Sequence, residues 1–142
     1  MDTWPVADHA ATQLPGLLAP LVSRCVGYRY EGFAPGTHLG LPSVGITLVV
    51  SLGEPTMLRT LPDPGQPPVG FAALVGGLST KPAVIAHDGS QFGVQLELTP
   101  AGVRTLLGMP GGELADTVVD LGEVVPQSGE LQERLAVTPG WA

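Results

Sequence analysis

Glycine and proline interrupt this chain too often for long helices to dominate it. Its 142 residues include 20 glycines and 15 prolines, spread between strongly apolar segments rather than gathered into one low-complexity block. Charged residues make up only 13% of the chain, whereas globular domains usually carry about a quarter. Because long surface helices need a charged outer face, the pattern favours short elements, mainly β-strands, joined by tight turns.

Alternation of side chains predicts most of these strands. Residues 44–52 form the clearest one, since one side of the alternation is wholly apolar and the other is small. The segment 69–78 is predicted to bend at Gly76-Gly77, and Asp88-Gly89 is predicted to close a hairpin. Further strands are expected at residues 21–33, 57–61, 83–87 and 91–98. Short strands with tight turns of this kind indicate a barrel or a sandwich.

Helices are expected only after the strands. Thr99 is a good N-cap, Pro100 suits the first helical position, and Gly108 with Pro110 ends the helix. The other expectations are a turn at residues 113–115, an extended or irregular segment at residues 117–121, and a last helix that Ser128 caps and that contains Leu131 and Leu135. The fold class is therefore mainly β, of the α+β type.

The length of the chain fits one domain. We expect an N-terminal arm at residues 1–20, a β-barrel at residues 21–98 and a helical C-terminal part of the same domain at residues 99–142. The arm contains three prolines and no sustained period, so we expect at most a turn of helix around residues 14–19. Residues 31–43 and 62–68 are rich in glycine and proline and are expected to be loops.

The charge balance excludes nucleic acid as a partner of this segment. Six Lys and Arg stand against 13 Asp and Glu, so the formal charge is −7, which repels phosphate backbones. The single cysteine, Cys25, excludes an internal disulfide and any cysteine-rich metal cluster. Asp2 and Asp8 stand where a signal peptide would be basic, and no apolar run reaches the roughly 18 residues of a membrane span. We expect a soluble, cytoplasmic protein that does not contact membranes.

Motifs of the common enzyme classes are missing from the sequence. It contains no Gly-x-Ser-x-Gly elbow, no Gly-x-Gly-x-x-Gly fingerprint and no phosphate-binding loop. We therefore assign no catalytic residue and no cofactor, and we expect the chain not to be an enzyme. A His-x-His pair, typical of metal-binding barrels, is also missing, so no metal site is predicted at His9, His38 or His87.

Two interpretations remain open for Gln95 and Glu97, which lie opposite the apolar side of their strand. In the simpler one, this side of the strand is solvated. In the other, it lines the mouth of a barrel and hydrogen-bonds a small ligand. The candidate ligand-binding residues are then Tyr28, His38, Thr47, Gln95 and Glu97. Leu131 and Leu135, at helical spacing, form half of a dimer contact or cover the barrel.

Several segments together resemble the N-terminal domain of AraC-type transcriptional regulators, especially actinobacterial ones. The most specific match is Leu-Thr-Pro-x-Gly-x-x-x-Leu-Leu-Gly-x-Pro at residues 98–110, and the resemblance covers about residues 20–141. The other matching segments are Val26-Gly-Tyr-Arg-Tyr30, His38-Leu-Gly-Leu-Pro-Ser43, Ile46-Thr-Leu-Val-Val-Ser-Leu-Gly53, Val75-Gly-Gly-Leu78 and Gly93-Val-Gln-Leu-Glu-Leu98.

The resemblance implies a cupin-like β-barrel of about six to eight strands followed by short C-terminal helices. Such a domain senses a small effector, forms a homodimer, or does both, and DNA is bound by a separate helix-turn-helix region of the full-length regulator. That region is absent from this sequence, so we expect the chain to be part of a longer protein. Two alternatives remain: a stand-alone cupin-like metal-dependent enzyme or small-molecule binder using His38, His87 and Glu97, and a dimerisation module without a pocket.

Overall fold

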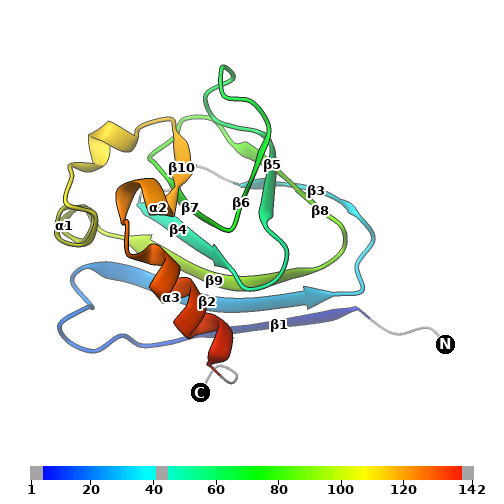
Figure 1. Cartoon of the computed structure of the whole chain (residues 1–142), viewed down its shortest axis with the longest axis horizontal. Helices are drawn as coiled ribbons and strands as arrows, with labels where there is room; N and C mark the ends of the chain where they lie inside the picture. Colours follow the sequence, from blue (N-terminus) through cyan, green and yellow to red (C-terminus); the bar gives the residue numbers. More distant parts are fainter. Residues whose placement is uncertain (1–4, 41–44, 139–142) are drawn as a thin grey trace.

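The chain folds into two antiparallel sheets and a few short helices (Figure 1). The computed structural model describes residues 5–40 and 45–138. The first sheet has the order β1 (Val6–Ala11), β2 (Val22–Glu31), β9 (Gln91–Leu98), β4 (Ile46–Ser51), β7 (Ala73–Gly76) and β10 (Val118–Asp120). The second has the order β3 (Gly36–Gly40), β8 (Ala83–His87), β5 (Thr56–Thr60) and β6 (Val69–Phe71). The expectation of a mainly β fold is confirmed.

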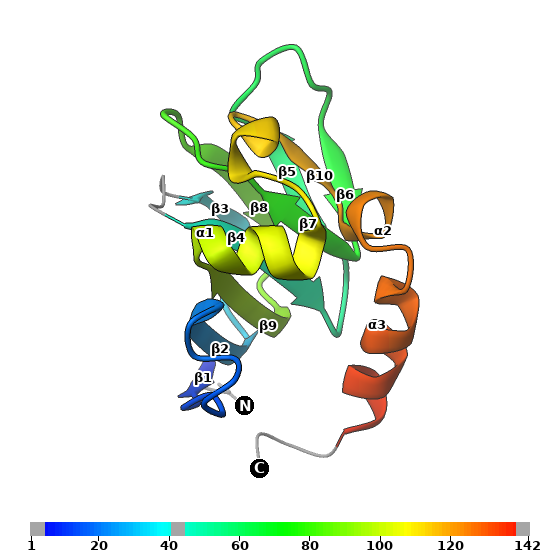
Figure 2. The ribbon, with the colours of Figure 1, turned by 90° about the vertical axis from the view of Figure 1, so that its left-hand side faces the viewer.

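Neither sheet closes on itself, so the described residues form no closed barrel. They contain ten strands rather than six to eight. The second sheet packs on one face of the first, where Leu58 and Phe71 meet Leu74 and Val118 in a small apolar cluster. The helices cover the opposite face of the first sheet. Figure 2 shows α2 (Leu121–Val124) and α3 (Ser128–Val137) on one side of the molecule and β3 and β8 on the other.

The larger core lies between the first sheet and the helices. Ile46, Leu48 and Val50 of β4 are buried there, as is Leu98 of β9. Residues from the helical part complete this core: Val103, Leu107, Leu114 and Leu121. Strand alternation thus sends the apolar side of β4 toward the helices and its smaller side toward the second sheet.

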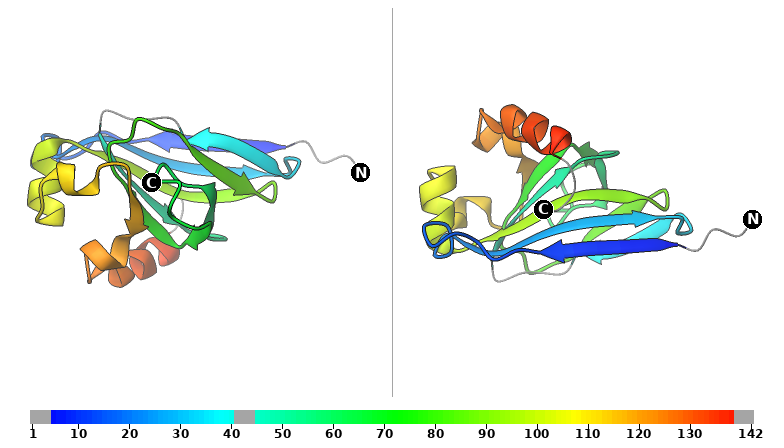
Figure 3. Two further views of the ribbon diagram at one scale, coloured as in Figure 1. Left: turned by 90° about the horizontal axis from the view of Figure 1, so that it is seen from above. Right: turned by 90° about the horizontal axis from the view of Figure 1, so that it is seen from below.

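Two strands lie where no strand was expected. β1, inside the predicted arm, pairs with β2 from Val6 opposite Glu31 to Ala11 opposite Val26, and Figure 3 shows β1, β2 and β9 side by side. β3, inside the predicted loop, pairs with β8. Both are edge strands, rich in alanine or glycine, and most of their residues are exposed. Their sequences therefore carry little apolar alternation, and backbone pairing determines their structure.

The segment 69–78 is interrupted at a different place from the predicted one. β6 ends at Phe71 and belongs to the second sheet, while β7 begins at Ala73 and belongs to the first. The predicted bend at Gly76-Gly77 is therefore wrong. At Gly77 the chain instead passes so close to the carbonyl oxygen of Leu114 that a Cβ atom would overlap it. The chain therefore crosses from the second sheet to the first at Ala72, between β6 and β7.

The turn at Asp88-Gly89 exists, but it does not close a hairpin. Gly89 has a φ of 106°, and the carboxylate of Asp88 accepts a hydrogen bond from the amide of Ser90 at 3.0 Å. β8 and β9, on either side of the turn, lie in different sheets. The local turn chemistry was predicted correctly, whereas the strand pairing was decided by distant partners.

The first helix agrees with its prediction. α1 (Pro100–Gly102) continues into a π-helical turn, η1 (Val103–Leu107), and Gly108 follows with a φ of 70°. The Thr99 hydroxyl accepts a hydrogen bond from the amide of Gly102 at 3.1 Å and donates one to the carbonyl of Pro20 at 2.7 Å. Thr99 therefore caps the helix and also ties it to the start of β2.

The rest of the helical part follows the expected order with one correction. η2 (Gly111–Leu114) covers most of the predicted turn, and β10 occupies the segment predicted as extended. Ser128 is the first residue of α3 and is buried, so it is not the cap; Gln127 holds that position without a side-chain hydrogen bond. None of the helices in residues 5–40 and 45–138 is long and apolar enough to cross a membrane.

Replacing Thr99 with Ala removes every hydrogen bond of its hydroxyl, including a longer one to the carbonyl of Leu21 at 3.3 Å. We expect the free energy of unfolding to fall by about 1–2 kcal/mol. Thr99→Ser is the matched control, because it keeps the hydroxyl, and it should lose roughly half a kcal/mol or less. Urea denaturation followed by circular dichroism measures both variants. Equal losses in the two variants would show that the hydroxyl is not what stabilises this junction.

Candidate ligand site between the two sheets

The polar side of the first sheet faces the second sheet rather than open solvent. Thr47 and Val49 of β4 lie opposite Glu97 and Gln95 of β9, and these side chains share the face that looks toward the second sheet. All four residues are half-buried. The helices cover the apolar side of β4, while Phe92 at the start of β9 remains 39% exposed. Thr47 and Gln95 are therefore partly covered by the second sheet and partly exposed.

A cavity of about 300 Å³ lies between the sheets, and we call it the inter-sheet cavity. Three candidate residues line it: His38 from β3, Thr47 from β4 and Gln95 from β9. They come from both sheets and from segments far apart in the sequence. Apolar side chains form much of the remaining wall, among them Val49, Leu58, Leu74, Ile85 and Val118. The cavity therefore combines a few polar groups with an apolar wall, as small-molecule sites usually do.

Two further polar residues of the cavity were missed from the sequence. Ser79 and Lys81 line it from the connection between β7 and β8. The Ser79 hydroxyl donates a hydrogen bond to the Lys81 carbonyl at 2.6 Å and accepts one from the Lys81 amide at 3.1 Å. The amide of Thr80 also bonds to the carboxylate of Asp116 at 3.2 Å. No local pattern marks this connection as functional, because only the stacking of the sheets brings it to the cavity.

A wider groove of about 680 Å³ opens beside the cavity, and we call it the end groove. Tyr28 lines this groove rather than the inter-sheet cavity, and Thr56 lines both. The Tyr28 ring lies over Gly93, where a Cβ atom would come within 2.7 Å of the Tyr28 hydroxyl oxygen. Burial, together with the neighbouring Tyr30, raises the pKa of Tyr28 to about 12. Tyr28 is therefore a neutral hydrogen-bonding group at physiological pH.

Two histidines stand where the cavity and the groove meet. The rings of His38, which lines the cavity, and His87, which lines the groove, have centroids 5.8 Å apart. The amide of Gly89 donates a hydrogen bond to Nδ1 of His87 at 3.2 Å, so neutral His87 carries its proton on Nε2. Partial burial, and to a lesser extent His87, lowers the pKa of His38. Within the described residues, no three His, Cys, Asp or Glu side chains gather closely enough to hold a metal ion.

Glu97 is separated from the other candidates. It lies opposite Thr47 on the sheet, yet it is part of neither the cavity lining nor the groove lining. Its backbone carbonyl accepts a hydrogen bond from the hydroxyl of Ser23 at 3.3 Å. The structure thus brings together His38, Thr47 and Gln95, and places Tyr28 next door and Glu97 outside.

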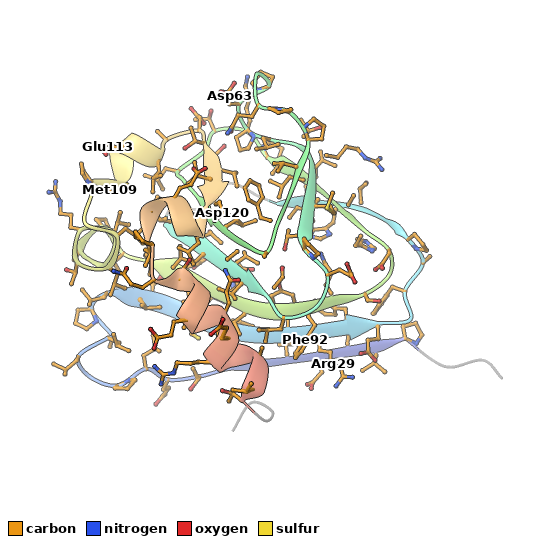
Figure 4. The ribbon with its side chains drawn as sticks, viewed as in Figure 1. Arg29, Asp63, Phe92, Met109, Glu113 and Asp120 are labelled. Carbon is orange, nitrogen blue, oxygen red and sulfur yellow. The ribbon has the colours of Figure 1, made fainter. Side chains whose placement is uncertain are left out.

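Leu131 and Leu135 of α3 have different surroundings. Leu135 packs against the larger core and borders a hollow of about 540 Å³ between α3 and the strands β1, β2 and β9. Leu131 is 43% exposed. Arg29 and Phe92, labelled in Figure 4, lie together on the floor of this hollow, with the guanidinium carbon 5.9 Å from the ring centroid. Cys25 also borders the hollow, and burial raises the pKa of its thiol. Leu135 therefore covers the sheet, and only Leu131 offers a largely open surface.

Comparisons with models of known families, with curated proteins and with solved structures found no match to this chain.

The lowered pKa of His38 gives a prediction for stability in acid. Because the folded state holds a proton on this imidazole less readily than the unfolded state, stability should fall as the pH drops through the ordinary imidazole range. In an NMR titration His38 should titrate below free histidine. In His87→Gln its pKa should rise but stay below the ordinary value, because burial is the larger cause. His9→Gln, on the edge strand β1, is the control and should leave the titration unchanged.

Proposed function

We propose that this chain is the regulatory domain of an AraC-type transcription regulator, and that it binds a small effector in the inter-sheet cavity. The observation that carries the proposal is the convergence of His38, Thr47 and Gln95, from three strands and both sheets, on one cavity of about 300 Å³. Known small-molecule sites begin at about this volume. The family resemblance of residues 98–110 and of the segments before them supports the same assignment.

In this proposal the two stacked sheets take the place of the cupin-like barrel that the resemblance implies, opened along its edges. The helices α1 to α3 are the short C-terminal helices. The domain carries out no chemistry and needs no cofactor. It acts in the cytoplasm, where a separate helix-turn-helix region of the full-length regulator contacts DNA. The charge of −7 suits a segment that stays away from DNA itself.

An effector regulates only if it binds one arrangement of the domain better than another. A ligand in the cavity contacts β3 and β8 on one side and β4 and β9 on the other. The reverse face of β4 packs against Val103 and Leu107 through Ile46, Leu48 and Val50. A shift of β4 toward the ligand therefore changes the packing of the helices, and this is the route by which we propose that binding is signalled.

Binding in the cavity should depend on its polar groups. We expect at least one compound from a metabolite panel to raise the melting temperature of the chain. Gln95→Leu should abolish most of that rise, because it replaces a hydrogen-bonding amide in the cavity with an apolar group of similar size. Gln91→Leu makes the same change in the end groove and should retain the rise. If no compound stabilises the chain, a dimerisation module without a pocket becomes the better description.

We also propose that the domain forms a homodimer in which Leu131 of α3 contacts the second copy. Light scattering should then show a mass that rises with protein concentration, and Leu131→Lys should shift it toward the monomer. Leu135→Ala is a different kind of variant, because Leu135 packs on its own sheet. It should lower the free energy of unfolding, by about 2 kcal/mol for a partly buried leucine. A mass unchanged by Leu131→Lys would exclude this surface.

The regulator assignment is tested most directly on the source gene. If the reading frame continues past the codon for Ala142 into a basic segment with two helix-turn-helix patterns, the DNA-binding half of the regulator is found. If a stop codon follows Ala142, the regulator proposal fails, and a stand-alone small-molecule binder explains the cavity.

A further inference from the structure

The charges around the inter-sheet cavity are unusual for so acidic a protein. The chain has 13 Asp and Glu against six Lys and Arg, yet among the residues that the structure describes no carboxylate lines this cavity, and Lys81 is the one charged residue of the lining. Glu97 lies opposite Thr47 on the sheet, but its side chain is outside the lining. An apolar cavity with a cation at its edge favours an anionic ligand.

Lys81 is positioned to supply that charge. Its backbone is held by the two hydrogen bonds with Ser79, and Lys81 is an exposed residue that lines the cavity. On its other side it borders a shallow hollow with Asp63 and Asp116. These two carboxylates already accept hydrogen bonds from the amides of Gly65 and Thr80. Lys81 forms no ion pair with any part of the chain that the structure describes.

The polar groups lie at different depths in the cavity. Thr47 is opposite Gly76, next to the connection that carries Lys81, so its hydroxyl lies at the same end. Gln95 is opposite Val49, one side-chain layer farther along β4. Apolar side chains such as Leu58, Leu74 and Ile85 fill the wall around them. A ligand matches this arrangement if its charged group is at the end near Lys81 and Thr47 and the rest of it is mostly apolar.

The volume limits the size of the ligand, and the single cation limits its charge. At about 300 Å³ the cavity lies at the small end of the range for small-molecule sites. A dianion such as a phosphate monoester would leave one charge unneutralised against an apolar wall, which is costly. A monoanion leaves no charge unneutralised, because the Lys81 ammonium balances it.

We propose that the effector is a small organic acid, with one carboxylate that pairs with Lys81 and a mostly apolar body that fits the cavity of about 300 Å³. The inference rests on the proposed function, since it names the ligand class of the same cavity. The carboxylate pairs with the Lys81 ammonium and accepts a hydrogen bond from the Thr47 hydroxyl. The body lies between Leu58, Leu74 and Ile85, and Gln95 and His38 hydrogen-bond any further polar group.

The test compares acids with their uncharged amides. Benzoate, phenylacetate, cyclohexanecarboxylate and hexanoate are each titrated beside the matching primary amide, at neutral pH and constant ionic strength, with amide chemical shifts of the whole chain as the readout. At least one acid should bind about tenfold more tightly than its amide and shift Thr47 and Gln95. Lys81→Gln should remove that advantage and leave amide binding unchanged. Arg104→Gln, which removes the same charge from the exposed surface of η1, should change neither.

Amides that bind as tightly as their acids, or acid binding that survives Lys81→Gln, would overturn the inference. The Gln95-dependent stabilisation described above separates this failure from failure of the proposed function. If a neutral or cationic compound stabilises the chain through Gln95 while no acid binds, only the ligand class is wrong. If neither binds, the effector site itself is wrong.

Discussion

The position of β4 and β9 between the helices and the second sheet is the constraint on which the rest of this structure depends. One face of these strands packs against Val103, Leu107 and the other helical residues of the larger core. The other face looks across a narrow space to the second sheet. A sheet that packs on both sides covers much of its central strands. The polar residues Thr47 and Gln95 are consequently half-buried between the sheets, where a ligand in the inter-sheet cavity would contact them.

Each face of the sheet combines a packed cluster with an open space. On the helix side Val75, Leu98 and Val103 are fully buried, and a hollow of about 540 Å³ lies between α3 and the strands β1, β2 and β9. On the side toward the second sheet there is a small cluster around Leu58 and Phe71, and a cavity remains beside it. The glycines and small residues that interrupt the chain contribute to this cavity, since they remove side-chain volume from the strands around it. A space that the core does not fill is available to a ligand, and contacts with both sheets let that ligand change how they pack.

Charge and shape therefore act together in the proposed regulator. As proposed, the acidic charge of the chain would keep this segment away from DNA, while in the described part of the chain no carboxylate lines the cavity and Lys81 does. The same separation of charge would then favour an organic acid over a cation as the ligand. Regulation then requires no catalysis, only a difference in affinity between two arrangements of sheets and helices.

The sequence by itself determined the elements that depend on local chemistry. Alternation predicted β2, β4 and β9, and the cap, proline and glycine signals predicted the helix that Thr99 begins. Tertiary structure decided what depends on distant partners. Pairing with distant strands made β1 and β3 extended, although their residues carry little apolar signal. It also divided residues 69–78 between two sheets and placed β8 and β9 in different sheets. Tertiary structure also brought Lys81 to His38, Thr47 and Gln95. The physical reason is that turns and caps are made by neighbours in the chain, whereas strand pairing and cavities are made by residues far apart in it.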